Sequence, residues 1–589
     1  KLHGAGVSEK GAFGRSYTDY QNINSQQTLN WAHDYGKHHV DALIGHEFNW
    51  MRTSSLNYKA AYSLIEGFDT FANYIFPNSG GTFSGIGGGE DQEALEGYFL
   101  RANYNYDNKY YVTGSVRADG SSKFRYNDDR WGVFWSVGGA WRISAEPWAA
   151  DATWLTDLKL RADYGVIGNQ NGIGRYSGYQ TWSYSATGYT TPGSYSPAGW
   201  KLSQNGFTTP LTWEKKKTVD VGLDFRLWDR FYGTMDWYQT NTDDVAWNAP
   251  ISYAMSGQTT LAANSARMRT RGFELELGVD IIKTPNTLWS FNVNGSTYYT
   301  TILEVPEGTG SAQLNGCWTA PADSWSIAGT GGTSNNITYL RGIGKPYYNM
   351  YIYKYGGVDP ASGLPLIAST VSSTNIDNLK KTSGNVYGDI VEGNTVYTTD
   401  YTLATRQEFG DATPDFIGGF GTSLKWKNLD FSAQFAFQIG GKFLSVADAN
   451  HYYRSDQTGY YHMSADLKGN TFTASNTGAR YPMVILNNPN SNGYTGGSTI
   501  GSWAYTDMAL YSASYLNVKN LTLGYNFPQK WMDKIGIGGI RVYASFDNFW
   551  MLTTHKGIDP RMSLVGGMDV GAMAYPYMRT CSLGVNVTF

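Results

Sequence analysis

The stretch Phe273-Glu-Leu-Glu-Leu-Gly-Val-Asp-Ile281 alternates apolar and polar residues from end to end. A period of two is typical of a β-strand with one apolar and one polar face, because successive side chains of a strand point to opposite sides. The same alternation runs through many other segments, among them 158–166, 219–227 and 581–589. The sequence therefore predicts an all-β chain whose strands carry an apolar face and a polar, often charged, face.

Strand length and loop pattern decide what the apolar faces touch. The expected strands are longer than the roughly 5–6 residues usual in soluble proteins, and a tilted strand needs roughly 9–11 residues to cross a bilayer. We expect strands at 15–33, 38–58, 93–105, 109–119, 131–143, 155–168, 213–227, 230–246, 268–282, 287–303, 413–426, 429–441, 513–527, 539–550 and 579–589.

The connections between these strands alternate strictly between short and long. The short ones are 34–37, 106–108, 144–154, 228–229, 283–286, 427–428 and 528–538, and the long ones are about 59–92, 120–130, 169–212, 247–267, 304–412, 442–512 and 551–578. Short periplasmic turns and long outer loops are characteristic of outer-membrane barrels. A transmembrane antiparallel β-barrel with long extracellular loops is therefore the expected fold.

The composition of the 589 residues agrees with this fold class and excludes others. Aromatic residues make up 15%, charged residues only 16%, and the formal net charge is −4. No apolar run approaches the roughly 18 residues of a helical membrane span. Two cysteines, Cys317 and Cys581, cannot form a disulfide scaffold, and the near-neutral charge gives no attraction for nucleic acid.

The number of expected strands is odd. A closed antiparallel barrel in a single chain needs an even number, and an open edge in lipid would leave backbone groups without hydrogen bonds. We therefore expect residues 1–589 to be the C-terminal portion of a larger barrel whose first strands lie upstream. An additional strand within 304–412 would overturn that inference.

The sequence resembles the C-terminal barrel of the SusC/RagA-type TonB-dependent transporters of Bacteroidota outer membranes. The resemblance includes Arg271-Gly-Phe-Glu-Leu-Glu-Leu277 and Pro414-Asp-Phe-Ile-Gly-Gly-Phe420. Further segments that carry it, in the same order along the chain, are 116–124, 130–144, 158–169, 353–360, 515–525, 547–549 and the terminal Phe589.

This resemblance implies a barrel of 22 strands with an N-terminal plug. It also implies a SusD-like surface lipoprotein as a lid, and energy from the TonB-ExbB-ExbD complex acting on an N-terminal TonB box. The expected function is import of oligosaccharides or peptides, without cofactor and without catalytic residues. Neither the plug nor the TonB box is recognisable in the 589 residues, which leaves their location open.

Alternation places several charged residues on the lumen side of the expected barrel. They are candidates for contact with plug or substrate: Arg117, Arg161, Asp163, Asp220, Asp224, Glu274 and Glu276. For Asp119 we favour a strand-end turn in Ala118-Asp-Gly-Ser-Ser122, because aspartate and serine satisfy their own backbone in turns. A glycosidase pair at Glu274 and Glu276 is disfavoured, since a repeating acidic face needs no catalysis.

Other motifs have weaker functional interpretations. Trp318, Trp325, Tyr347 and Tyr348 are possible loop contacts for sugar rings, although exposed aromatics also pack loops. Phe589 resembles the terminal aromatic signal for barrel assembly. His33, His38, His39 and His46 are expected near a solvated turn and not in a metal site. Gly85-Ile-Gly-Gly-Gly89 is expected to be a flexible outer loop.

We expect a nutrient importer, with segments 304–412 and 442–512 as the best candidates for lid contact and substrate capture. Three alternatives stay open at this point. A passive porin would show a steadily open pore, a surface adhesin would bind ligand without uptake, and a soluble carbohydrate-binding protein would need no detergent.

Overall fold

The structure is a computed structural model of the chain. It describes residues 12–61, 86–124, 130–177, 179, 182–185, 199–202, 211–250, 260–306, 317–319, 338–369, 391–392, 395–398, 406–445, 448, 464–483, 506–555, 559–561, 564–565, 568–569 and 577–589. Within these ranges, no helix is both long enough and apolar enough to span a membrane.

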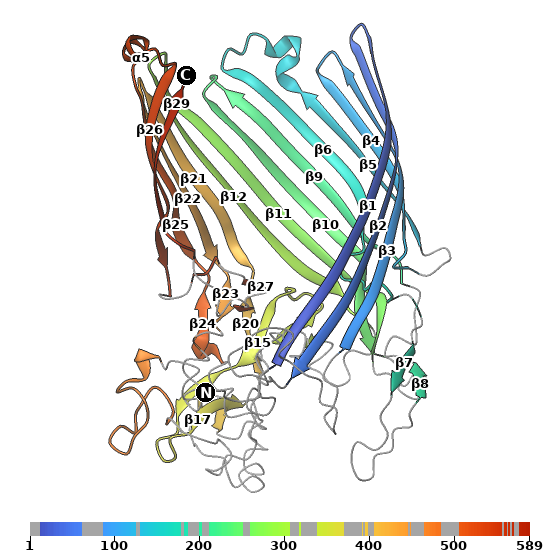
Figure 1. The fold of residues 1–589 in the computed structure, drawn as a ribbon, viewed down its shortest axis with the longest axis vertical. Coiled ribbons are helices and arrows are strands. Elements are labelled where there is room, and N and C mark those ends of the chain that lie inside the picture. Colours follow the sequence, from blue (N-terminus) through green and yellow to red (C-terminus); the bar gives the residue numbers. More distant parts are fainter. Residues whose placement is uncertain are drawn as a thin grey trace. The chain divides into compact units, whose positions relative to one another are not determined.

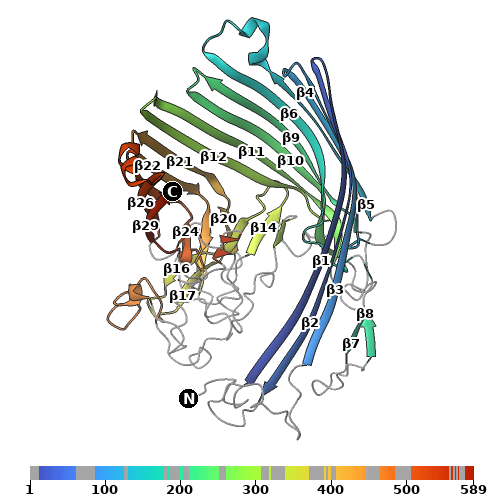
Figure 2. The same ribbon diagram turned by 45° about the horizontal axis from the view of Figure 1, so that its top comes forward.

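One antiparallel sheet of 15 strands dominates the fold, and its strands are hydrogen-bonded to each other in chain order (Figures 1 and 2). Each strand expected from the sequence coincides with one of them, so the all-β prediction is confirmed. The strands are β1 (Ala12–Tyr35), β2 (His38–Ala61), β3 (Ile86–Tyr106), β4 (Tyr110–Ser121), β5 (Trp131–Arg142), β6 (Leu155–Asn169), β9 (Glu214–Leu227), β10 (Phe231–Pro250), β11 (Thr260–Thr284), β12 (Thr287–Glu304), β21 (Pro414–Trp426), β22 (Leu429–Gly440), β25 (Tyr515–Asn526), β26 (Gly539–Thr553) and β29 (Thr580–Thr588).

The tight turns between strands use residues with positive φ. Trp228 and Asp229 have φ angles of 51° and 55°, and Lys427 has 51°. Such left-handed residues match the twist of the strands that they join, which keeps a hairpin short. The short connection expected at 228–229 is a hairpin turn over 228–230, and the one expected at 427–428 is confirmed as a hairpin turn.

Two local predictions were wrong. Residues 86–89 are not a loop but the start of β3, paired with the end of β2. A Cβ on Gly88 would collide with the Ser55 carbonyl oxygen, so glycine lets the two backbones approach closely. Asp119 is not in a strand-end turn but in β4, where it pairs with Arg117.

The chain divides into two compact units. The first comprises Lys1–Trp141, Ala162–Val219 and Thr242–Ala266, and the second comprises Arg142–Arg161, Asp220–Asn241 and Arg267–Phe589. The first unit contains the small sheet β7 (Trp182–Ser185) and β8 (Gly199–Leu202) outside the strands named above.

Three small sheets in the second unit are built from its long connections. Strands in 304–412 join these sheets and not the 15-stranded one, so within the described residues the strand number stays odd. The small sheets comprise β13 (Cys317–Thr319), β14 (Thr338–Gly342), β15 (Asn349–Tyr353) and β20 (Arg406–Asp411); β16 (Tyr355–Val358), β17 (Pro365–Ser369), β18 (Val391–Glu392) and β19 (Thr395–Thr398); and β23 (Lys442–Leu444), β24 (Leu510–Ser512), β27 (Leu564–Val565) and β28 (Met568–Asp569). Helix α5 (Gln529–Ile535) and the C-terminus lie at the other end of this unit's strands (Figure 1).

The apolar faces of the strands are exposed instead of forming a shared core. On β5, Val133 is 63% exposed whereas Phe134, on the opposite face, is 6% exposed. Leu583 and Val585 of β29 are 82% and 62% exposed. A water-soluble sandwich would bury these side chains, so their exposure indicates a lipid-facing surface, as expected for a membrane barrel.

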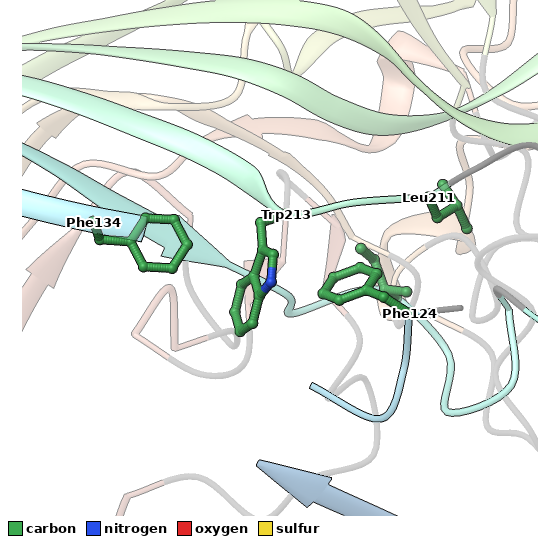
Figure 3. Close-up of a cluster of buried hydrophobic side chains, with 5 residues drawn as sticks. Phe124, Phe134, Leu211 and Trp213 are labelled. Atoms are coloured by element: carbon green, nitrogen blue, oxygen red, sulfur yellow. The ribbon is translucent and has the colours of Figure 1, made fainter. Parts of the chain in front are cut away.

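A compact hydrophobic cluster lies in the first unit. Trp213 stands between Phe134 and Phe124, with ring centroids 5.4 and 5.2 Å away (Figure 3). Leu211 and Ile173 complete the cluster, whose members are all at least nine-tenths buried. The Trp213 indole Nε1 donates a hydrogen bond to the Arg130 carbonyl at 3.0 Å.

Candidate functional site

The face of the sheet opposite the exposed apolar side chains carries most of the charged residues predicted from alternation. We call it the polar face. Arg117 on β4 donates from Nε to Asp119 at 2.6 Å and from Nη2 to Glu47 on β2 at 3.0 Å. Its guanidinium also lies 5.2 Å from the ring centre of Phe99 on β3. Arg117 is therefore the centre of an ion cluster that joins three strands.

A second ion cluster is centred on Arg161 of β6. Its guanidinium binds both carboxylate oxygens of Asp224 on β9, each at 3.0 Å. Nη2 also donates to Asp236 on β10 at 2.8 Å. A two-pronged contact of this kind fixes the orientation of both groups. Arg161 and Asp224 were predicted on the polar face, whereas Asp236 was not.

A third cluster was missed entirely by sequence reasoning. Arg541 on β26 donates from Nη2 to Asp430 on β22 at 2.5 Å, and Asn526 on β25 donates to the same carboxylate at 3.3 Å. Both Arg541 and Asp430 alternate with apolar neighbours, which is a signal for the polar face. Their pairing depends on strand register, and no short sequence window contains that information.

An acidic groove lies on the polar face of the second unit, between β10 and β21. Its volume is about 480 Å³. Glu274 and Glu276 stand opposite Ser296 and Asn294 of β12 in the strand register. The groove therefore offers carboxylates beside uncharged hydrogen-bonding groups; its lining residues are Thr234, Asp236, Glu274, Leu275, Glu276, Asn294, Gly295, Ser296, Ile417 and Gly418.

The remaining polar-face candidates are less organised. Asp163 is exposed on β6. It lies beside Gly138 of β5, because a Cβ added to that glycine would be 3.2 Å from the Asp163 Cβ. Asp220 is half-buried on β9.

The loop aromatics named from the sequence divide into three cases. Tyr347 and Tyr348 contact each other edge to face at 4.9 Å, and the Arg341 guanidinium lies 4.1 Å from the Tyr347 ring centre. Burial, with a contribution from Tyr347, raises the pKa of the Tyr348 hydroxyl above its ordinary value. Trp318 belongs to strand β13, and Trp325 lies outside the described residues. The two tyrosines thus form a packed cluster with arginine.

Phe589, predicted as an assembly signal, follows β29 and is 96% exposed. His38 lies 2.7 Å from the Tyr104 hydroxyl, His39 lies 2.5 Å from Asp34, and His46 lies 3.2 Å from Glu96. His33 packs against the ring of Tyr35. In the part of the chain that the structure describes, no group of three or more histidine, cysteine, aspartate or glutamate side chains could hold a metal ion.

Long antiparallel strands with an exposed apolar face and an ion-paired polar face define a transmembrane β-barrel protein of the outer membrane. The family model described as TonB dependent receptor-like, beta-barrel, matches residues 3–403. The chain belongs to this family of TonB-dependent receptor barrels.

Individual relatives agree with this assignment. TonB-dependent receptor P3 of Formosa agariphila is 26% identical over 599 residues, which cover 100% of this chain and 54% of the relative. TonB-dependent receptor SusC of Bacteroides thetaiotaomicron is 27% identical, over 85% of this chain and 44% of the relative. The chain spans about half the length of the curated relatives that it matches.

A solved structure described as the RagAB peptide transporter has a similar fold. The TM-score is 0.73 at 24% sequence identity, over 98% of this chain and 56% of that chain. This likeness is one of fold.

Proposed function

We propose that the intact protein imports oligosaccharides or peptides across the outer membrane in a TonB-dependent manner. The observation that carries this proposal is membership of the TonB-dependent receptor barrel family over residues 3–403. Relatives named TonB-dependent receptor and SusC, and a structural neighbour named as a peptide transporter, support transport as the activity.

In this proposal the polar face lines the lumen of the barrel. The clusters around Arg117 and Arg161 would present mixed charge to a plug or substrate, because charges cost little where water remains. Asp163 and Asp220 would add negative charge, and the groove at Glu274 and Glu276 would accept hydrogen-bond donors. Oligosaccharide hydroxyls and peptide amides both offer such donors, so the groove suits either substrate class.

The partners and the domain organisation belong to the same proposal. A SusD-like lipoprotein would cover the long loops, including those with Trp318, Trp325, Tyr347 and Tyr348, and the TonB-ExbB-ExbD complex would act on a preceding plug segment. Residues 1–589 would form the C-terminal portion of the barrel. The odd strand number and the match to about half of each relative support that organisation. Phe589 would serve as the barrel-assembly signal.

Uptake in whole cells tests the importer. A strain that expresses the intact protein should accumulate a labelled oligosaccharide or peptide only when TonB is present and the inner membrane is energised. Replacing residues 464–483 by a short Gly-Ser linker should reduce uptake while heat-modifiable migration shows a folded barrel. A linker of the same composition inserted in the short turn at 427–428 serves as the control and should leave uptake unchanged.

The outcomes separate the importer from a porin. A steady conductance of the intact protein in planar bilayers, together with uptake that is independent of TonB, would contradict the proposal. Ligand binding by cells without any accumulation would likewise contradict it and favour an adhesin.

A further inference from the structure

Helix α5 lies in the connection between β25 and β26. It is the one α-helix of the second unit whose two ends both lie within the described residues. Pro528 caps its start with φ −57°, and Gly536 ends it with φ 69°, in the left-handed region that favours glycine. The Gly536 amide donates to the Met532 carbonyl and closes the last turn. The helix has only seven residues, so packing against the rest of the protein stabilises it, and helix propensity alone would not.

The sides of α5 differ sharply in chemistry. Met532 is buried at 4% exposure and anchors the helix to the protein. Trp531 and Ile535 lie four residues apart, hence on one side, and are 54% and 57% exposed. Lys530 and Lys534 form the adjacent side and are exposed.

The remaining side of the helix is polar. The Gln529 side-chain amide donates to the Asp533 carboxylate at 2.9 Å. Around the helix axis the order is therefore buried methionine, exposed apolar pair, lysines, and a glutamine–aspartate pair. An amphipathic helix that lies at a membrane surface shows this order, with apolar residues toward the acyl chains and lysines at headgroup level.

The exposed apolar side continues the lipid-facing surface of the sheet. The Trp531 ring lies 6.2 Å from that of Phe527, which lies 5.4 Å from that of Tyr525. Tyr525 stands opposite Val542 in the strand register, and both are exposed on the apolar face of the sheet. An unbroken aromatic row thus leads from the strands onto the helix.

We propose that α5 docks on the phospholipid headgroup layer of the leaflet on the side of the short turns. Trp531 and Ile535 insert between the lipids, and Lys530 and Lys534 bind their phosphates. Continuity with the lipid-facing surface and the charge complementarity between lysine and phosphate both favour a phospholipid layer over a soluble partner. The proposal depends on the outer-membrane location and not on the transport activity.

Site-directed spin labelling of the intact protein in phospholipid nanodiscs tests the docking. Cys317 and Cys581 are replaced by serine, and single variants Gln529→Cys, Trp531→Cys, Asp533→Cys and Ile535→Cys are labelled. Collision rates with oxygen, which concentrates in lipid, and with a water-soluble nickel chelate are then measured. The oxygen-to-nickel ratio should be several-fold higher at 531 and 535 than at 529 and 533.

The lysines are tested in a second series. In the Ile535→Cys background, Lys530→Glu with Lys534→Glu should lower the ratio at 535 in nanodiscs that contain anionic phosphatidylglycerol. The Asp533→Asn variant is the matched control and should leave the ratio unchanged. Equal oxygen-to-nickel ratios at all four labelled positions would overturn the proposal, because the apolar side of α5 would then face water and not lipid.

Discussion

Each ion cluster contains a glycine on its middle strand, and this glycine explains how one arginine side chain can reach across three strands. Gly97 on β3 lies between Arg117 and Glu47, Gly222 on β9 between Arg161 and Asp236, and Gly524 on β25 between Arg541 and Asp430. A Cβ at any of these glycines would collide with the arginine Nη2 and with a carboxylate oxygen. The polar face therefore contains the same arrangement three times. In each, an arginine side chain crosses over a glycine and binds a carboxylate two strands away.

Replacing Gly222 by alanine should break the bridge from Arg161 to Asp236. The added Cβ would lie 2.6 Å from Arg161 Nη2, so the guanidinium must move. The colliding atoms are the ends of two flexible side chains that can move aside, so we expect a cost at the lower end of overpacking, about 1 kcal/mol. The lost ion pair contributes little of that cost, because the Arg161 and Asp236 side chains are 30% and 20% exposed, water screens them, and Arg161 keeps its contact with Asp224. Denaturant unfolding of the barrel in lipid or detergent measures the loss.

Gly139→Ala is the control for that substitution. Its new Cβ would meet no atom closer than the Tyr111 carbonyl oxygen at 3.6 Å, which is ordinary contact. The control should be neutral or slightly stabilising, because alanine loses less backbone entropy than glycine in a strand. Equal unfolding midpoints for Gly222→Ala and Gly139→Ala would show that the bridge does not depend on the glycine.

The strands were predictable because alternation is a local signal, whereas their partners and outer ends were not. The Phe273–Ile281 pattern located β11, yet that strand begins at Thr260, where alternation has faded. Pairing with a long neighbour extends such ends, as it does for residues 86–89 of β3 beside β2. Arg161 and Asp224 could be assigned to the polar face by the same signal. Asp236 becomes a partner of Arg161, and Asp430 a partner of Arg541, only through the strand register, which joins strands far apart in the sequence.

Packing in the Trp213 cluster holds together the ends of several strands in the first unit. Trp213→Ala would remove a ring that fills the space between Phe124 and Phe134, and large-to-small changes of this type cost about 3–5 kcal/mol. We expect that loss in chemical unfolding of the barrel. Trp213→Phe should cost much less, about 1 kcal/mol, since it mainly removes the hydrogen bond to Arg130.

Trp135→Leu provides a comparison from the same sheet. Trp135 is 45% exposed on the apolar face of β5, where a leucine side chain suits the lipid equally well. Its unfolding midpoint should stay near that of the unchanged protein. If Trp213→Ala and Trp135→Leu were equally stable, the cluster would not fasten the strands.

At the scale of the whole molecule, the sheet runs from β1 to β29, and its strand order gives neither of these two strands a second neighbour among the described residues. In an antiparallel sheet of 15 strands the first and last run in the same direction, so they cannot close it by antiparallel pairing. In hydrocarbon each unpaired backbone group costs several kcal/mol. The proposed organisation therefore requires an odd number of further strands between β1 and β29.

Hydrogen exchange can test that requirement directly. In the intact protein in a bilayer, peptides covering Ala12–Tyr35 and Thr580–Thr588 should exchange as slowly as those covering Leu429–Gly440, a strand with neighbours on both sides. In residues 1–589 produced alone, the two edge peptides should exchange much faster while the central strand stays protected, because only the edges lose their partners. Equal and strong protection of both edges in the shorter chain would mean that β1 and β29 find partners within it. The barrel would then close without further strands, and the assignment of this chain as one portion of a larger barrel would be wrong.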